Sequence, residues 1–303
     1  MNRRNFLSGI TLSAAGLSFY PYSANSLFAG RDGEMFFDIS LAEWSLRKKL
    51  FSGQLKNLDF PEYTRKNFGI EAVEYVNQFF PSAKSNYIQE LRQRCFDAGV
   101  KSLLIMIDKE GDLGEQYYPK RMRAVERHFP WVEAAKLLGC HSIRVNARGN
   151  GTEKEVADAV TESLRKLSEF ANDYDINVLV ENHGGYSSNG KWLASVIENI
   201  GMENCGTLPD FGNFRISNKE EYDKYKGMKE LMPYAKGVSA KSNRFDEEGN
   251  EVSTDFEKVL KIIKESGYRD YIGIEYSGQQ LDEDKGIIAT RDLLIRYGEK
   301  LSG

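Results

Sequence analysis

The sequence is poor in histidine, cysteine and net charge. Its 303 residues include three histidines and three cysteines, and 41 lysine and arginine residues nearly balance 45 aspartate and glutamate residues. Cys95, Cys140 and Cys205 cannot all pair with one another and form no C-x-x-C motif, which argues against a disulfide scaffold or a zinc ribbon. A formal net charge of -4 without a long basic run argues against a nucleic-acid partner.

The first 30 residues have too few apolar side chains for a membrane span. Arg3 and Arg4 precede a weakly apolar stretch, residues 6–20, that is rich in glycine, serine and alanine. This arrangement is typical of an export signal, and the segment RRNFL resembles the twin-arginine signal. We therefore expect an export signal at residues 1–30, a periplasmic protein and no stable membrane insertion after processing. An ordinary secretory signal and a ragged N-terminal helix are the alternatives.

From residue 34 to residue 303, short apolar runs alternate with segments of helical periodicity. The runs predicted to be strands are 36–41, 72–76, 102–107, 142–146, 176–181, 206–210, 237–241 and 271–275. The clearest predicted helices are 85–98, 120–138, 153–174, 191–200, 217–232, 254–265 and 285–299. Eight such units in about 270 residues predict an α/β protein with a single (β/α)8 TIM barrel. The competing fold, a doubly wound open sheet, would be unusually wide, and SLAEWSL stands where its glycine-rich loop is expected.

Three of the last four predicted strands end on an acidic residue. These residues are Glu181, Asp210 and Glu275. Active sites of such barrels lie where strands end and the following loops begin, so the three carboxylates should converge and repel one another. A divalent cation with oxygen ligands would relieve that repulsion. The alternative is three unrelated surface acids at strand ends.

Other strand ends bring further polar and aromatic residues to the same mouth. They are Trp44, Glu74, Asp108, Arg144 and Asn146. Each of them alone could be a structural hydrogen-bonding residue. Together they predict a polar, partly aromatic site for a small polyhydroxylated molecule.

Four motifs give the sequence a recognisable likeness to a known family. They are VENHGG (180–185), PDFGNF (209–214), GVSAKS (237–242) and GIEYSG (273–278). With them, residues 36–300 resemble the xylose isomerase-like TIM barrels, the sugar isomerase and epimerase superfamily. The resemblance implies one divalent metal ion (Mn, Mg, Co or Zn), held by a Glu, an Asp, a His and a Glu at the ends of strands five to eight. Glu181, Asp210 and Glu275 match three of these ligands.

The strand-seven ligand does not match, because Ser239 stands where the family usually has histidine. A hydroxyl is a poorer ligand than imidazole, so the metal site is either weaker or rearranged. His183 could supply a nitrogen or touch the substrate, or could be a loop histidine bonded to the backbone. Lys241 could pair with Asp210, hold a substrate oxygen or form a structural ion pair. His128 and His141 precede strand four and are expected to lie away from the mouth.

The resemblance implies proton transfer beside a carbonyl of a sugar or keto-sugar, with Glu181 and Glu275 as the catalytic pair. Isomerisation or epimerisation would result, and β-elimination from a 3-keto-glycoside is the alternative outcome of the same first step. A non-catalytic sugar-binding barrel is the alternative of another class. A DNA-repair endonuclease of the same superfamily would need several histidines around a zinc cluster, and the three histidines present cannot build it.

Overall fold

The structure is a computed structural model that describes residues 35–302. The expected export signal at residues 1–30 lies outside this described range. Within the range, none of the helices combines the length and the hydrophobicity that a membrane crossing needs.

Eight parallel strands form the central sheet. They are β1 (Asp38–Ala42), β2 (Ala72–Val76), β3 (Lys101–Met106), β4 (Ser142–Asn146), β5 (Asn177–Glu181), β6 (Cys205–Leu208), β9 (Val238–Ser242) and β10 (Tyr271–Tyr276). Their order is β6-β5-β4-β3-β2-β1-β10-β9, and every neighbouring pair is parallel. Strand neighbours along the chain are therefore also neighbours in space.

The two end strands of this sheet, β6 and β9, are joined by short parallel bridges. Thr207 pairs with Ala235, and Asp210 pairs with Ser239. The Ser239 amide donates to the carbonyl of Pro209 at 2.9 Å, and its own carbonyl accepts from the amide of Phe211 at 3.0 Å. These contacts close the sheet into the predicted (β/α)8 barrel, and they place the closure beside two of the candidate site residues.

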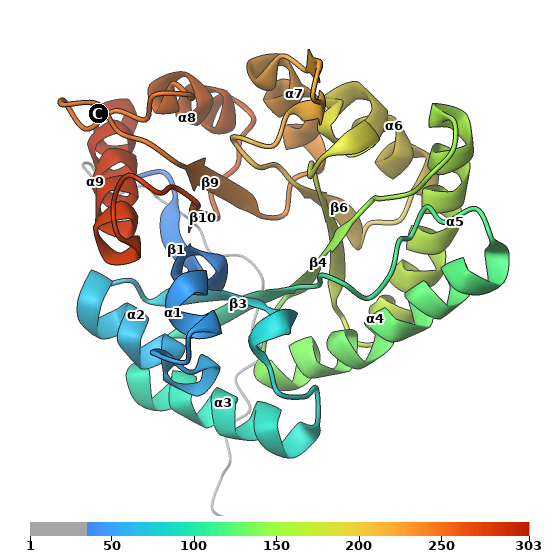
Figure 1. The fold of residues 1–303 in the computed structure, drawn as a ribbon, viewed down its shortest axis with the longest axis horizontal. Coiled ribbons are helices and arrows are strands. Elements are labelled where there is room, and N and C mark those ends of the chain that lie inside the picture. Colours follow the sequence, from blue (N-terminus) through green and yellow to red (C-terminus); the bar gives the residue numbers. More distant parts are fainter. Residues whose placement is uncertain (1–34, 303) are drawn as a thin grey trace, which may run out of the picture. The chain divides into compact units, whose positions relative to one another are not determined.

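The helices surround the strands. They are α1 (Arg47–Phe51), α2 (Phe60–Phe68), α3 (Ser85–Ala98), α4 (Tyr118–Leu138), α5 (Glu153–Asn172), α6 (Gly190–Ile200), α7 (Lys224–Leu231), α8 (Phe256–Glu265) and α9 (Glu283–Ser302). Short 3-10 helices are η1 (Glu43–Leu46), η2 (Asn57–Asp59), η3 (Asn77–Phe79), η4 (Gly185–Ser188) and η5 (Met232–Tyr234). From α2 to α9 the helices follow one another around the strands in chain order (Figure 1).

Local sequence explains where the long helices begin and end. Thr152 and Glu155 form a reciprocal capping box at the start of α5, which satisfies amide groups that have no partner within the helix. Gly99 and Gly139 adopt left-handed backbone conformations directly after α3 and α4, where glycine avoids the steric cost of a side chain.

The apolar side chains form two clusters. The larger one lies between the strands and the helices. The smaller one joins inward-facing residues of β1, β2, β3, β5 and β6, namely Ala42, Val76, Leu104, Met106, Leu179 and Leu208. Trp44 and Phe79 pack against this inner cluster. This part of the barrel interior is thus filled by apolar side chains.

One predicted helix begins too early. The prediction placed a helix at residues 217–232, whereas the structure has an antiparallel hairpin of β7 (Arg215–Ser217) and β8 (Glu220–Glu221). Helix α7 starts only at Lys224, because the Asp223 side chain caps it by accepting the amide of Lys226 at 2.8 Å. The hairpin lies outside the eight strand-helix units.

Candidate active site

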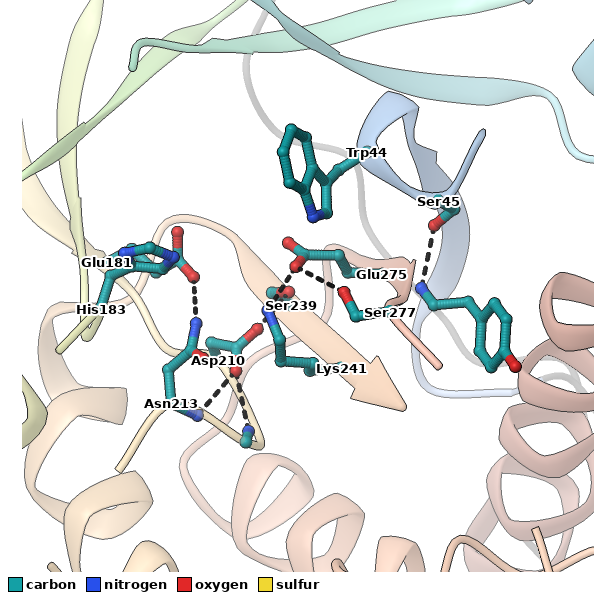
Figure 2. A network of polar contacts seen from close by, with 12 residues as sticks. Trp44, Ser45, Glu181, His183, Asp210, Asn213, Ser239, Lys241, Glu275 and Ser277 are labelled. Carbon is teal, nitrogen blue, oxygen red and sulfur yellow. Dashed lines mark hydrogen bonds and ion pairs between the residues drawn. The ribbon is translucent and has the colours of Figure 1, made fainter. Parts of the chain in front are cut away.

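The structure brings the three strand-end acids together. One carboxylate oxygen from each of Glu181, Asp210 and Glu275 lies within 4.8 Å of the others. Their exposed fractions are only 1%, 0% and 3%. Figure 2 shows the three carboxylates turned toward one another from different strand ends. Three buried acids so close together require compensating positive charge or protonation.

Asp210 is fixed by hydrogen bonds to both of its carboxylate oxygens. Oδ1 accepts the backbone amides of Gly212 and Asn213 at 2.8 and 2.9 Å. Oδ2 accepts the Ser239 hydroxyl at 2.7 Å. Burial is the main reason that the pKa of Asp210 is raised to about 7, and the neighbouring carboxylates add to it. Asp210 therefore has a fixed orientation and a strong need for a nearby cation.

Glu275 pairs with Lys241, its direct neighbour in the register of β10 and β9. The Lys241 ammonium forms an ion pair with Oε1, and the Ser277 hydroxyl lies 3.4 Å from the same oxygen. Burial raises the pKa of Glu275, but the charge and the hydrogen bond of Lys241 outweigh it, so the pKa lies below its ordinary value. Glu275 is held in its ionised form.

Glu181 is held by an arginine and an asparagine. Arg144 lies 2.7 Å from Oε2 of Glu181 and 3.1 Å from Oδ1 of Asp108, and Asn213 donates to Oε1 of Glu181 at 2.7 Å. Asn146 donates to the same Asp108 oxygen as Arg144, at 2.7 Å. Burial, opposed by the guanidinium, raises the pKa of Glu181. The acid pair Glu181 and Glu275 thus has environments that shift the two pKa values in opposite directions.

The acids at this site outnumber the cations that pair with them by two. The acids are Asp108, Glu181, Asp210 and Glu275, and the paired cations are Arg144 and Lys241. With all four acids ionised, two negative charges remain, which is the charge that one divalent ion offsets; without such an ion, the raised pKa values of Glu181 and Asp210 favour protonation instead. Lys241 and Ser277 both contact Oε1 of Glu275, so Oε2 is available to a cation. All donors are oxygens, and this set fits a hard divalent ion.

A cavity of about 380 Å³ opens beside the acidic cluster. The predicted residues that line it are Trp44, Asp108, Arg144, Asn146, His183 and Glu275. In Figure 2 the Trp44 indole faces the carboxylate of Glu275. The cavity combines an aromatic surface with hydrogen-bonding groups of both kinds, which is a suitable lining for a small hydroxylated molecule.

His183 faces the cavity as a neutral imidazole. Arg148 donates to its Nδ1 at 2.6 Å, so the ring proton is on Nε2. Burial and then the positive charges of Arg144 and Lys241 lower the pKa of His183 to about 4. Among the described residues, the group of side chains that could hold a metal ion consists of the three acids and does not include this histidine. His183 is therefore placed to contact a substrate.

Glu74 lies deeper in the barrel than its place at a strand end suggests. Its side chain is 3% exposed and does not line the cavity. The Ser40 hydroxyl donates to its Oε1 at 2.6 Å, and a Cβ atom added to Gly273 would lie 2.3 Å from that oxygen. Burial raises the pKa of Glu74 to about 7. Glu74 thus lies in the barrel interior, beneath the residues of the mouth.

The sequence and the fold can now be compared with known proteins. The family described as xylose isomerase-like TIM barrel matches residues 64–297. The chain belongs to the xylose isomerase-like TIM-barrel family. No curated protein matches the sequence.

Several solved structures share the fold of this family member. An L-ribulose 3-epimerase superposes with a TM-score of 0.69 and 16% identity, over 87% of this chain and 95% of that one. The 3-keto-D-glucoside 4-epimerase from E. coli gives 0.65 and 14%, over 87% and 99%. A xylose isomerase-like protein from Mycobacterium smegmatis in complex with magnesium gives 0.64 and 15%, over 81% and 89%. At these sequence identities, the comparison shows that this chain and those proteins share a fold.

The strand-seven position holds a serine where the resemblance implies a histidine. Ser239 is 1% exposed and donates to Asp210, so it supports a carboxylate at the place where the resemblance implies an imidazole. Lys241 pairs with Glu275; of the roles that its sequence position left open, the structure shows the ion pair. Strand β9 therefore presents a hydroxyl and an ammonium group to the three acids.

Sequence reasoning missed some residues of the site and misplaced one. Asn213 bonds to both Glu181 and Asp210, and its place in the PDFGNF motif was the available signal. His128 lines the cavity, contrary to the expectation that it lies away from the mouth. Helix α4 contacts the loop after β3, where Glu110 accepts a hydrogen bond from Trp131 of the same helix at 3.0 Å, and Glu110 and His128 both line the cavity.

Proposed function

We propose that this protein is a divalent-metal-dependent sugar epimerase or isomerase that transfers a proton at the carbon beside a carbonyl of a keto-sugar. The observation that carries the proposal is the cluster of three buried carboxylates within 4.8 Å of one another, next to a cavity of about 380 Å³. Solved structures with the same fold include an L-ribulose 3-epimerase and a 3-keto-D-glucoside 4-epimerase, which agrees with a small carbohydrate substrate.

Glu181, Asp210 and Glu275 would hold the metal ion. Of Mn, Mg, Co and Zn, the oxygen-only donor set favours magnesium or manganese; solved structures with this fold include both a magnesium complex and a zinc-bound protein. When bound, the ion would polarise the substrate carbonyl and stabilise the negative charge that develops on it.

The protein's own residues would move the proton. Lys241 holds Glu275 ionised, so Glu275 is the group that removes the proton from carbon. Glu181, whose pKa is raised, delivers a proton from its different position in the cluster (Figure 2). Two acids with oppositely shifted pKa values are the arrangement that divides the base and acid roles. Asp210, fixed by backbone amides and Ser239, serves as a ligand.

The remaining cavity residues would bind and orient the sugar. Arg144 and Asn146 share Asp108, and this group presents donors and an acceptor to hydroxyl groups. Trp44 offers an apolar ring face to a sugar ring, and neutral His183 has the Nε2–H group as a donor. Correct positioning of the reacting carbon contributes to the rate as much as the acid and base do.

Metal analysis tests this proposal directly. The untagged protein should contain about one Mg or Mn per chain, and Glu181→Gln and Asp210→Asn should lose it. Glu198→Gln, a matched change of an exposed acid on α6, should retain it. Substoichiometric metal in the unchanged protein that neither site variant reduces would overturn the proposal and favour a non-catalytic sugar-binding barrel.

A substrate assay separates the possible reactions. The protein is incubated with free ketoses and with a 3-keto-glucoside, and the products are separated by chromatography. Interconverted sugars are the expected products. Release of the aglycone from the 3-keto-glucoside would instead show β-elimination. Loss of turnover in Glu275→Gln, with unchanged thermal stability, is expected if this residue acts in the reaction.

We also propose that the protein is exported to the periplasm in folded form. The support is the twin-arginine-like segment at the start of the chain. All three cysteines are free and buried in the described part of the chain, and burial raises the pKa of each thiol. Free thiols of this kind are compatible with folding before export.

A further inference from the structure

We infer that a second cavity beside the candidate active site binds an aromatic group attached to the sugar, so that the substrate is an aryl glycoside of a keto-sugar. The inference rests on the proposed function for the sugar and names the substrate class. It adds a binding site next to the first cavity.

The second cavity has a volume of about 680 Å³ and is therefore larger than the first. Its side-chain lining includes Asp112, Arg148, His183, Tyr186, Ile216 and Ser217. Asp112, Arg148 and His183 also line the first cavity. The two cavities thus share a wall at the bonded pair of Arg148 and His183, and a ligand that reaches this pair from one side meets the other cavity next.

The volumes indicate a substrate with two parts. Both values lie within the range of about 300–1,000 Å³ that is typical of small-molecule sites. A single sugar ring held at Glu275 occupies the first cavity and leaves the second one empty. A substituent on that sugar would extend past His183 into the second cavity.

The lining of the second cavity suits a flat apolar group with a polar edge. Tyr186 is held in place because its hydroxyl donates to the carbonyl of Gly151 at 3.1 Å and its ring lies 5.9 Å from that of Trp192. Gly184 and Gly185 adopt positive φ angles of 82° and 60°, and a Cβ atom on either would meet no atom within 4 Å. An aromatic ring can therefore lie beside Tyr186 without meeting side chains from these two positions.

The hairpin of β7 and β8 completes this cavity. Ile216 is half-buried and Ser217 is exposed, and both line the second cavity while neither lines the first. The hairpin adds no strand to the eight-stranded sheet. The hairpin thus contributes only to the second cavity, to which it adds an apolar side chain and a hydroxyl group.

Binding of unreactive glycosides tests the inference without requiring turnover. By calorimetry, phenyl β-D-glucoside should bind about tenfold more tightly than methyl β-D-glucoside, the ratio expected for one buried aromatic contact. Ile216→Trp should fill the cavity and abolish this difference. Lys219→Trp, on the same hairpin but outside the lining, should preserve it, and Ser217→Tyr provides a second blocking variant.

Equal binding of the two glucosides to the unchanged protein, including no binding of either, would overturn the inference. A preference for the phenyl glucoside that persists in both Ile216→Trp and Ser217→Tyr would also overturn it. Metal analysis and turnover assays on the unchanged protein separate the two proposals. If the unchanged protein holds no metal and shows no turnover but the phenyl preference remains, the proposed chemistry fails and the second site stands.

Discussion

Replacing Gly273 with alanine should destabilise the protein through a contact with Glu74. Gly273 lies on the inner side of β10, in register with Ser40 of β1. A Cβ atom at this position would lie 2.3 Å from Oε1 of Glu74, and 2.7 Å from both Cδ and Oε2. The carboxylate cannot turn away freely, since it is buried and bonded to Ser40.

The magnitude follows from two opposing effects. Overpacking a filled interior costs about 1–3 kcal/mol. Alanine also restricts the unfolded chain and returns about 0.4–1 kcal/mol. Gly273→Ala should therefore lower the free energy of unfolding by about 1–2 kcal/mol, the difference between these terms. In a Glu74→Ala background the contact is gone, and the same change should be neutral or slightly stabilising.

Urea unfolding of the four proteins in this double-mutant cycle measures the effect. Gly237→Ala is a matched control, because a Cβ atom at Gly237 would first meet Leu208 at an ordinary 3.4 Å. The interaction energy between Gly273→Ala and Glu74→Ala should be at least about 1 kcal/mol. An equal loss of stability in both backgrounds would refute the placement of Glu74 beneath the site.

Three other changes test the site and the N-terminus. Lys241→Met removes the cation that lowers the pKa of Glu275, so the acid limb of the pH profile of kcat/KM should move to higher pH; an unmoved limb would contradict the pairing. Ser239→His should raise the affinity for zinc about tenfold or more relative to magnesium, because imidazole is a softer ligand, as measured by competition with a chelator. Replacing Arg3 and Arg4 with lysine should leave the protein in the cytoplasm on cell fractionation, and unchanged export would indicate an ordinary secretory signal.

Periodic local patterns predicted the architecture well. The predicted strands at 72–76 and 142–146 and the predicted helix at 85–98 coincide with β2, β4 and α3, because their apolar spacing and glycine ends act within a few residues. The predicted start of α7 was wrong. Residues 217–222 have helix-compatible side chains, and only their pairing across a short hairpin decides their structure.

Only part of the candidate site could be predicted, because some of its contacts depend on how the strands pair. Strand-end positions of Glu181, Asp210 and Glu275 are visible in the sequence, because parallel strands bring their ends to one side of a barrel. The partner of Lys241 is not visible, because it depends on the register of β9 against β10. The depth of Glu74 depends likewise on the stagger of β2 within the barrel, which no single strand reveals.

The sequence by itself therefore determined the barrel and the acids at its mouth, since these follow from residue spacing along each strand and helix, and its motifs carried the resemblance to the family. Only the tertiary structure decided which cation pairs with which acid, which polar groups lie beneath the mouth, and that a second cavity adjoins the first. Those features arise where segments distant in the sequence meet, and their contacts are set by strand stagger and loop packing rather than by local pattern.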